Sequence, residues 1–189
     1  QDVLPGTEKK VWWVCGHGHH WRAAVSARTN RQSGCPYCSG KLVLTGFNDL
    51  ASQNPVLAAQ WDTERNGTLT PQQVTLASNR KAWWICEKGH SYQAVIASRV
   101  NGSGCPYCTN KKVLAGFNDL ATVEPRIAAE WHPTLNGSLT PEMVTAGSRK
   151  KVWWMCPLGH VWKAAIYPRT VARKCGCPVC AGKTKAASV

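Results

Sequence analysis

The feature that most constrains this chain is a cysteine and histidine pattern that occurs three times, at intervals of about seventy residues. Each copy begins with Cys-x3-His and closes with Cys-Pro-x-Cys. Three thiolates and one imidazole form the donor set of a tetrahedral structural zinc site, which has no open position for catalysis. The sequence therefore predicts three zinc ions per chain. The predicted ligands are Cys15, His19, Cys35 and Cys38 in the first copy, Cys86, His90, Cys105 and Cys108 in the second, and Cys156, His160, Cys177 and Cys180 in the third.

Disulfide bonding is the main alternative use of the ten cysteines. It gives no reason for a histidine to stand four residues after the first cysteine of every copy. The loop between the two ligand pairs has 15, 14 and 16 residues, whereas the spacing inside each pair is the same in all three copies. Such a combination is typical of a metal site, because the metal constrains its ligands and not the loop between them. The spacing therefore favours zinc.

Two ligand positions have competitors nearby. Cys175 lies two residues before Cys177 and has no counterpart in the other copies. We interpret it as a spare thiol, and its use as a ligand in place of Cys177 is the alternative. In the first copy, His17 and His20 lie close to His19 and could compete with it in principle. The register of the three copies favours His19.

The repeat length argues for small modules in a row. Modules of this size bury too little apolar surface to be robust alone, so each should fold around its metal. The chain has ten tryptophans and only two phenylalanines, so indoles should dominate the module cores. It begins at Gln1, inside a repeat, and we expect further domains outside this sequence. The predicted boundaries are 1–46, 47–116 and 117–189.

Each ligand pattern includes a predicted β-hairpin. Residues 11–15 and 21–27 mix β-branched and aromatic side chains on either side of a glycine-containing bend, and they should form two strands with the first ligand pair between them. Two tryptophans precede the first cysteine in every copy. Because neighbouring side chains in a strand point to opposite faces, one indole of each pair should point inward and one outward.

A second recurring block, at residues 47–76 and 117–146, links successive zinc patterns and should contain short helices. Asn48 or Asp49 can cap a helix that Pro55 divides into two pieces. A capping box with proline at the first helical position then predicts a third short helix at Thr70-Pro71-Gln72-Gln73. The predicted fold class is therefore small α+β modules stabilised by zinc, three in tandem, each a hairpin knuckle with short helices.

These residues resemble a known family. The run Trp-Trp-x-Cys-x-x-Gly-His, followed by Arg, Cys-Pro-x-Cys, Gly-x-Asn-Asp-Leu and Asn-Gly-x-Leu-Thr-Pro, is similar to the repeat of a bacterial family of treble-clef, zinc-ribbon-like modules of uncharacterised function. The motif stands at residues 83–92 and 153–162, and the resemblance covers nearly the whole chain. It implies tandem zinc modules that often accompany nuclease-like domains, which points to work on DNA. No such nuclease domain is evident in this sequence.

The charge of the chain predicts a polyanionic partner. The formal net charge is +13, and nine ligand thiolates with three zinc ions would leave it near +10. A chain this basic is expected to bind nucleic acid, and the resemblance places duplex DNA ahead of RNA. Basic residues recur ahead of each tryptophan pair and thirteen residues after each first cysteine. The candidate contacts are Lys9, Lys10, Arg80, Lys81, Arg149, Lys150 and Lys151 in the former set, and Arg28, Arg99 and Arg169 in the latter.

Both sets have structural alternatives. The lysine-rich groups could form an ordinary solvated face. The three aligned arginines could pair with Asp49 or Asp119, or hold carbonyl groups near the zinc. The outward indole of each pair could stack on a base, but burial under the neighbouring helical block is the preferred interpretation.

Catalysis has little support from the sequence. The ten carboxylates form no convincing pair, and the spare histidines, His17, His20 and His132, do not recur among the copies. We therefore predict a non-enzymatic protein, with a zinc-stapled protein-interaction module as the second hypothesis and a His-metal nuclease as the third. No apolar run approaches the length of a membrane span, and no signal-peptide pattern is present. Nine thiolates committed to metal suit a reducing compartment, so the predicted location is the cytoplasm.

Overall fold

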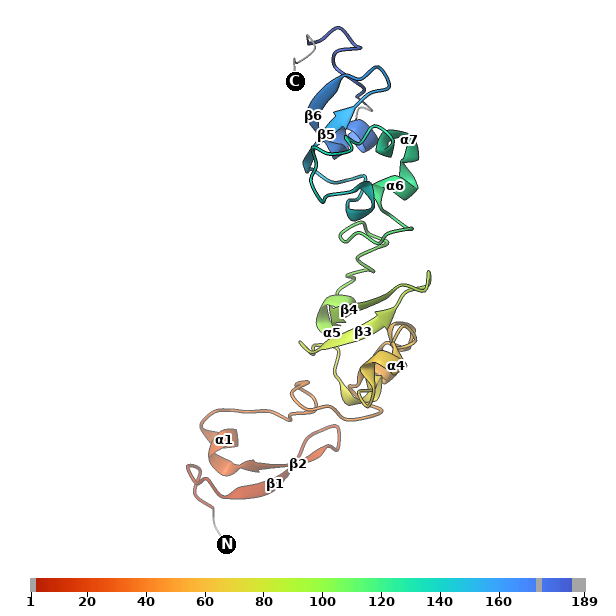
Figure 1. The fold of residues 1–189 in the computed structure, drawn as a ribbon. Helices are drawn as coiled ribbons and strands as arrows, with labels where there is room; N and C mark the ends of the chain where they lie inside the picture. The colour runs from red at the N-terminus through yellow and green to blue at the C-terminus, as the bar shows by residue number, and fades with distance from the viewer. Residues whose placement is uncertain (1–2, 173–174, 185–189) are drawn as a thin grey trace. The chain divides into compact units, whose positions relative to one another are not determined.

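The computed structural model describes residues 3–172 and 175–184. Two compact units, 1–103 and 104–189, make up the chain. Among the described residues there are three separate two-stranded antiparallel sheets, β1–β2 and β3–β4 in the first unit and β5–β6 in the second (Figure 1). No helix within the described ranges is long and apolar enough to cross a membrane. Small hairpins with short helices confirm the predicted class of zinc-stabilised α+β modules.

The three hairpins share one register. Each places an aromatic pair side by side, Trp13 with Trp21, Trp84 with Tyr92, and Trp154 with Trp162. The bend between the strands carries the first two ligands, as the sequence predicts. The strands are β1 (Lys10–Val14), β2 (His20–Ala24), β3 (Lys81–Ile85), β4 (Ser91–Val95), β5 (Lys151–Met155) and β6 (Val161–Ala165).

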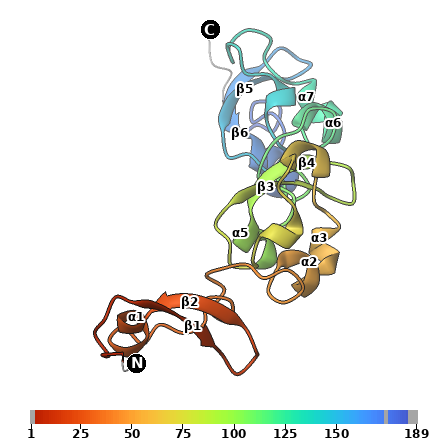
Figure 2. The same ribbon diagram turned by 90° about the horizontal axis from the view of Figure 1, so that it is seen from below.

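The second strand is shorter than predicted. In the first copy it ends at Ala24, and a helical turn, α1 (Val25–Thr29), takes the place of its expected last residues. The Thr29 hydroxyl donates to the carbonyl of Val25 at 3.0 Å, which satisfies a backbone acceptor of this short turn. Figure 1 and Figure 2 both show α1 against the β1–β2 hairpin. The equivalent turns are α5 (Ile96–Val100) and η3 (Pro168–Ala172).

The helical block follows the predicted division. Asp49 caps the first helix by accepting from the backbone N–H of Ser52 at 3.0 Å, and Asn54 caps the second by accepting from Leu57. Proline then occupies the first position of the second helix and of the 3-10 turn, where no N–H is needed. The elements are α2 (Leu50–Gln53), α3 (Pro55–Ala58), α4 (Thr63–Asn66) and η1 (Pro71–Gln73), repeated as α6 (Leu120–Val123), α7 (Pro125–Ala128) and η2 (Pro141–Met143).

Each block packs against the hairpin that follows it in the sequence. Trp84 and Trp154 are completely buried, one in each unit. A block tryptophan meets each of them edge to face, Trp61 at 5.1 Å between ring centroids and Trp131 at 5.4 Å. Such a contact contributes about 0.5–1.5 kcal/mol beyond the burial of its area. The block is therefore the second layer of the core under β3–β4 and β5–β6.

Candidate metal centres

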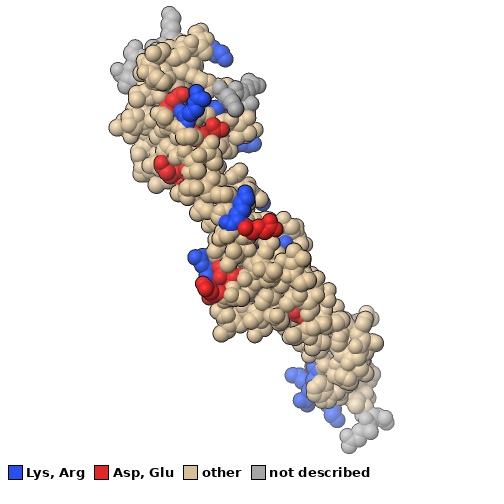
Figure 3. Space-filling view, turned by 90° about the vertical axis from the view of Figure 1, so that its right-hand side faces the viewer, with Lys and Arg blue, Asp and Glu red and all other residues tan. Residues whose placement is uncertain are grey.

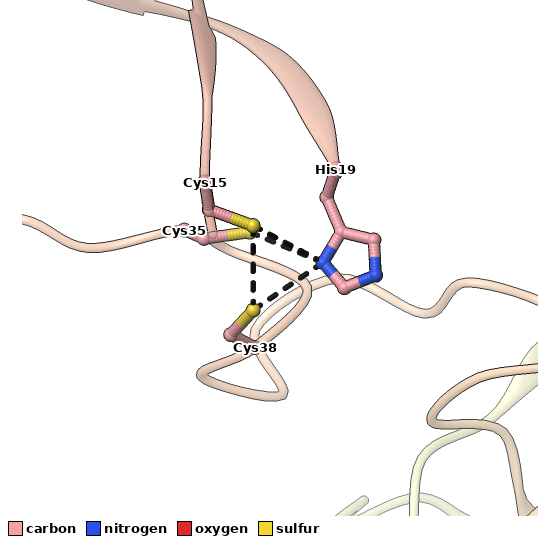
Figure 4. Close-up of side chains that lie close together, drawn as sticks. All are labelled: Cys15, His19, Cys35 and Cys38. Carbon is pink, nitrogen blue, oxygen red and sulfur yellow. Dashed lines mark hydrogen bonds between the residues drawn. The ribbon is translucent and has the colours of Figure 1, made fainter. Parts of the chain in front are cut away.

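The first ligand pair lies on the bend of the β1–β2 hairpin. The backbone N–H of Cys15 donates to the carbonyl of His19 at 3.1 Å, which closes the bend. Gly18 has a φ of +78°, a left-handed conformation that glycine adopts without strain, and its N–H donates to Cys15 at 2.9 Å. Cys35 and Cys38 come from the next loop, and all three sulfurs converge on the imidazole of His19 (Figure 4).

The distances between these donor atoms fit a tetrahedral zinc ion. Bonds of about 2.3 Å to sulfur and about 2.0–2.1 Å to nitrogen require roughly 3.8 Å between two sulfurs and roughly 3.6 Å between sulfur and nitrogen. The Sγ atoms of Cys15 and Cys38 are 3.7 Å apart. The Nδ1 atom of His19 lies 3.5, 3.7 and 3.3 Å from the Sγ atoms of Cys15, Cys35 and Cys38. A disulfide needs about 2.05 Å, so these thiols are arranged around a metal and not bonded to one another.

The same donor set recurs twice. In the third copy, Nδ1 of His160 lies 3.4, 3.7 and 3.3 Å from the Sγ atoms of Cys156, Cys177 and Cys180. In the second copy, Sγ of Cys86 lies 3.5 Å from Nδ1 of the histidine four residues later. Within each predicted set of four, all donor atoms lie within 4.8 Å of one another. The chain therefore carries three Cys3His sites, consistent with three zinc ions.

The competing residues lie outside the three sets. Cys175 is exposed and belongs to none of them, and Cys177 occupies the ligand position. His17 stands beside the first site, with Nδ1 3.6 Å from Sγ of Cys38, but the set is completed by His19. The ring of His17 instead stacks on that of His19, with centroids 6.0 Å apart. These placements agree with the register of the copies.

The thiols of the first site respond unequally to their surroundings. Burial raises the pKa of Cys15, but hydrogen bonds from the backbone of His17 and His19 and from the neighbouring thiols outweigh it and hold that pKa below the ordinary value. Burial, together with the thiols of Cys35 and Cys15, raises the pKa of Cys38 to about 11. In the third site, the Cys177 thiol and burial raise the pKa of Cys180 to about 11. Zinc must displace these protons, so its affinity should rise with pH.

The start of each helical block anchors the preceding Cys-Pro-x-Cys loop, a role that the sequence analysis missed. The side-chain amide of Asn48 donates to the carbonyls of Tyr37 and Leu42 at 2.7 and 2.9 Å. Asn118 makes the same bond to Tyr107 at 2.8 Å. Phe47 also packs on His19, with ring centroids 4.2 Å apart. The recurrence of Gly-Phe-Asn-Asp after the first and second Cys-Pro-x-Cys loops was the available signal, but it was interpreted only as a cap.

The three aligned arginines make contacts inside their modules, as the structural alternative expects, and their part in nucleic-acid binding stays a prediction. Arg169 is only 4% exposed, and its guanidinium donates to Glu130 at 2.6 Å and to the carbonyl of Cys175 at 3.1 Å. Arg28 donates to the carbonyl of Ser33 at 2.6 Å.

The guanidinium of Arg99 likewise donates to the carbonyl of Ser103 and to the side chain of Gln60. All three guanidinium groups also lie over aromatic rings of their own hairpin, at 4.2–5.7 Å from the centroids. Their hydrogen-bond partners are backbone carbonyl groups and, in the second and third modules, the side chains of Gln60 and Glu130. Within the described residues, neither Asp49 nor Asp119 pairs with them.

The other basic candidates are exposed. Lys10, Lys81 and Lys151 begin the first strand of their hairpins, and the basic residues just before them are exposed as well. None of the seven side chains ion-pairs with another residue in the described part of the chain. On the face drawn in Figure 3, Lys and Arg reach the surface in several small groups. The seven are Lys9, Lys10, Arg80, Lys81, Arg149, Lys150 and Lys151.

The comparison with known families agrees with the geometry of the sites. A family model described as a probable treble clef zinc finger domain matches the chain three times, over residues 1–41, 57–111 and 127–183. Each match contains one complete set of four ligands. No curated protein matches the chain significantly.

Proposed function

The chain belongs to the family of probable treble clef zinc finger domains, and from this premise we propose that its modules bind nucleic acid, with duplex DNA as the preferred form. The zinc ions hold the modules in shape, and no residue is assigned to catalysis. Each hairpin contributes one basic patch, so that several patches along the chain contact successive phosphates.

The observation that carries the proposal is the exposed basic group at the start of every hairpin. Lys10, Lys81 and Lys151 occupy one strand position in three hairpins, and no carboxylate of the described chain neutralises them. With a net charge of +13 on 189 residues, these groups create a positive potential that attracts a polyanion.

An aromatic residue on the same strand face adds a second kind of contact. Alternation along β1 puts Lys10 and Trp12 on one face, with Arg22 directly across from Trp12. In the third hairpin the cross-strand partner of Trp153 is Lys163, whose Nζ lies 5.5 Å from the ring centroid. An indole framed by cations suits contact with a sugar or a base between two phosphates.

A zinc-stapled protein-interaction module is the second candidate. The observation that favours it is the exposed apolar surface of the first hairpin, where Trp12 is 72% exposed and Val14 is 60% exposed. Solvent-exposed aromatic and β-branched side chains of this size often mark a protein contact.

A salt titration with duplex DNA, single-stranded DNA and RNA separates the two candidates. Four to eight phosphate contacts should make log affinity for duplex DNA fall with log salt at a slope of about −4 to −7. Neutralising Lys9-Lys10, Arg80-Lys81 or Lys150-Lys151 should make the slope shallower by about one to two units per pair, with zinc content unchanged.

Arg126→Ala is the matched control, because Arg126 is exposed on α7, away from the hairpin starts. It should leave the slope unchanged. If every probe binds weakly at low salt, or if the double variants bind like the parent, the basic groups are a solvated face and the protein-interaction candidate replaces this proposal.

A further inference from the structure

The bend of the first hairpin carries an imidazole that the metal set does not use. His17 stands two residues after Cys15, and its Nδ1 atom lies 3.6 Å from Sγ of Cys38. A tetrahedral zinc ion requires roughly this separation between a nitrogen and a sulfur that it binds together. His17 is therefore already at the right distance from one thiol of the site, although His19 completes the set of four.

Further contacts place the ring of His17 beside the site. It is nearly parallel to the ring of His19, with an angle of 18° between the two planes. It also lies near Phe47, at 6.3 Å between ring centroids, and Phe47 packs on His19 as well. The backbone of His17 hydrogen-bonds to the thiol of Cys15. The ring therefore faces the metal set through three neighbouring side chains, all of which follow it in the sequence.

This imidazole is particular to the first copy. The three bends share one backbone conformation, since the glycine before each ligand histidine has a φ of +78° to +80°. At the position of His17, however, the second and third copies carry Lys88 and Leu158. A protonated lysine amine has no lone pair for a metal, and leucine has no donor atom. Of the three bends, the first alone offers a second nitrogen ligand.

The backbone on both sides of His17 allows its ring to move. Gly16 precedes it and Gly18 follows it, and a side chain added at either position would meet nothing within 4 Å. The second and third copies have Glu87 and Pro157 in place of Gly16. Because glycine has the widest choice of φ and ψ, a local change of these two residues can bring His17 closer to the other sulfurs.

We propose that His17 is a reserve ligand of the first zinc site, which takes the place of His19 when that imidazole leaves the metal. The donor set then remains three thiolates and one imidazole, so the charge and the tetrahedral geometry of the site are preserved. The first site tolerates the loss of its histidine, whereas the second and third sites do not. Because metal binding is also the folding energy of a small zinc module, this reserve protects the fold of the first module.

The contact between His17 and Cys38 has a simpler alternative use. The Nδ1–H group can donate a hydrogen bond to the thiolate without ever binding the metal. The two roles differ when His19 is removed, because a hydrogen-bond donor leaves the zinc ion with three protein ligands and a reserve ligand restores the fourth. Removal of His19 is therefore the decisive experiment.

The first test measures zinc in the full chain after each histidine is replaced. His19→Ala should retain all three zinc ions, and so should His17→Ala. The two substitutions together should weaken zinc binding at the first site more than about 100-fold in competition with a chelator, since loss of an outer partner alone costs about 10–100-fold. His90→Ala is the matched control and should lose the second zinc, because Lys88 does not replace it.

The second test identifies the ligand directly. In a chain loaded with NMR-active cadmium, a bound imidazole shows scalar coupling between the metal and its ring protons. The metal of the first site should couple to the ring of His19 in the parent and to the ring of His17 in His19→Ala.

The reserve should also be transferable to the second bend. Glu87→Gly with Lys88→His gives that bend the sequence of the first, so these changes should restore the second zinc to His90→Ala. A second site that stays empty would contradict the assignment of the reserve to the bend itself.

Three further results would overturn the proposal. His19→Ala could lose its zinc, which would leave His17 as a hydrogen-bond donor only. His19→Ala and the double variant could bind zinc equally well, in which case water fills the fourth position. The cadmium of His19→Ala could couple to the ring of His20 instead. None of these measurements involves nucleic acid, so this proposal and the proposed function can fail separately.

Discussion

The first and third hairpins have the same metal site on different supports. In both sites the histidine Nδ1 lies 3.3–3.7 Å from the three sulfurs, and the first and last cysteine sulfurs are 3.7–3.8 Å apart. Under β5–β6, however, a block supplies Leu120, Val144 and Trp131, and Trp154 is completely buried. Under β1–β2 there is no such block in the described chain, and Trp13 stays half-buried. The geometry of the site is therefore independent of the core beneath it.

This difference separates two sources of stability. Metal binding fixes the bend and the ligand loop, and in small zinc modules it is also the folding energy. Burial of indoles and aliphatic side chains adds a second contribution where a block is present. We therefore expect the first hairpin to depend on zinc almost alone and the third to depend on both.

Ligand removal should give the largest effect and the clearest contrast. Cys35→Ser and Cys177→Ser should each release one zinc, a loss that can approach the roughly 10–16 kcal/mol seen for structural zinc sites. In Cys35→Ser, backbone amides throughout β1–β2 should then lose their protection from hydrogen exchange. In Cys177→Ser, those of β5–β6 should keep partial protection. Metal analysis and hydrogen exchange measure the two quantities. Equal loss of protection in both hairpins would contradict the comparison.

Cys175→Ser and His17→Ala are the controls for that experiment. Both residues are close to a zinc set without belonging to it, so each variant should retain three zinc ions. A zinc lost from either variant would show that the ligand assignment, and not the support, is at fault.

Truncating the inner indole should give the next largest effect. Trp154→Ala removes a completely buried side chain and should lower the free energy of unfolding of the third module by about 3–5 kcal/mol. Trp13→Ala removes a half-buried side chain and should lower the free energy of unfolding of the first module by clearly less. Denaturant-dependent hydrogen exchange reports both modules in one sample. Equal losses would mean that the block contributes little to the core.

The sequence predicted the parts whose signal is local. The three ligand sets follow from spacing alone, and the helix division follows from Asp49, Asn54 and Pro55, whose capping chemistry acts within three residues. The turn of α1 was not predicted because Val25 and Thr29 are β-branched and no side chain caps the turn.

Contacts between residues far apart in the chain could not be predicted from the sequence. Asn66 stands beside Gly67, a pair typical of a turn, but its side-chain amide also bonds the backbone N–H and carbonyl of Trp83, 17 positions away. Arg169 reaches Glu130 across 39 positions, and nothing near either residue indicates the other. The exposed basic groups remain a prediction, since their role depends on a partner.

The buried cap of α6, in the block that precedes the third hairpin, gives a smaller, pH-dependent effect. Asp119 is completely buried and accepts from Gly116 at 2.6 Å and from the hydroxyl of Thr122 at 2.7 Å. Burial raises the pKa of this carboxyl, but these bonds outweigh it and hold the pKa below its usual range. Asp119→Asn should therefore destabilise the third module by about 1–2 kcal/mol at neutral pH.

The pH dependence of that difference has a definite sign. A carboxyl with a lowered pKa stabilises the fold fully above its unfolded value of about 3.9, and the contribution is lost as pH falls through the lower folded value. The gap between parent and Asp119→Asn should thus stay constant from pH 7 to about 4.5. Comparing the two proteins at each pH cancels the parallel loss of zinc in acid, and a gap that closes above pH 5 would contradict the assignment.

The smallest effect concerns the arginine that each module holds over its aromatic pair. In the third module Arg169 pairs with Glu130 at 2.6 Å, whereas in the second Arg99 bonds the neutral amide of Gln60. Glu130→Gln converts one arrangement into the other and keeps a hydrogen-bond acceptor. Because Glu130 retains 27% side-chain exposure, the charge should contribute no more than about 1 kcal/mol, measurable as a small fall in exchange protection of β5–β6.

Glu130→Ala removes the acceptor and leaves the buried guanidinium with one partner fewer, so it should destabilise the third module clearly more. If Glu130→Gln is as damaging as Glu130→Ala, the ionic charge itself supports the third hairpin. The contrast with the first hairpin, where Arg28 donates to the neutral carbonyl of Ser33, is then electrostatic as well as apolar.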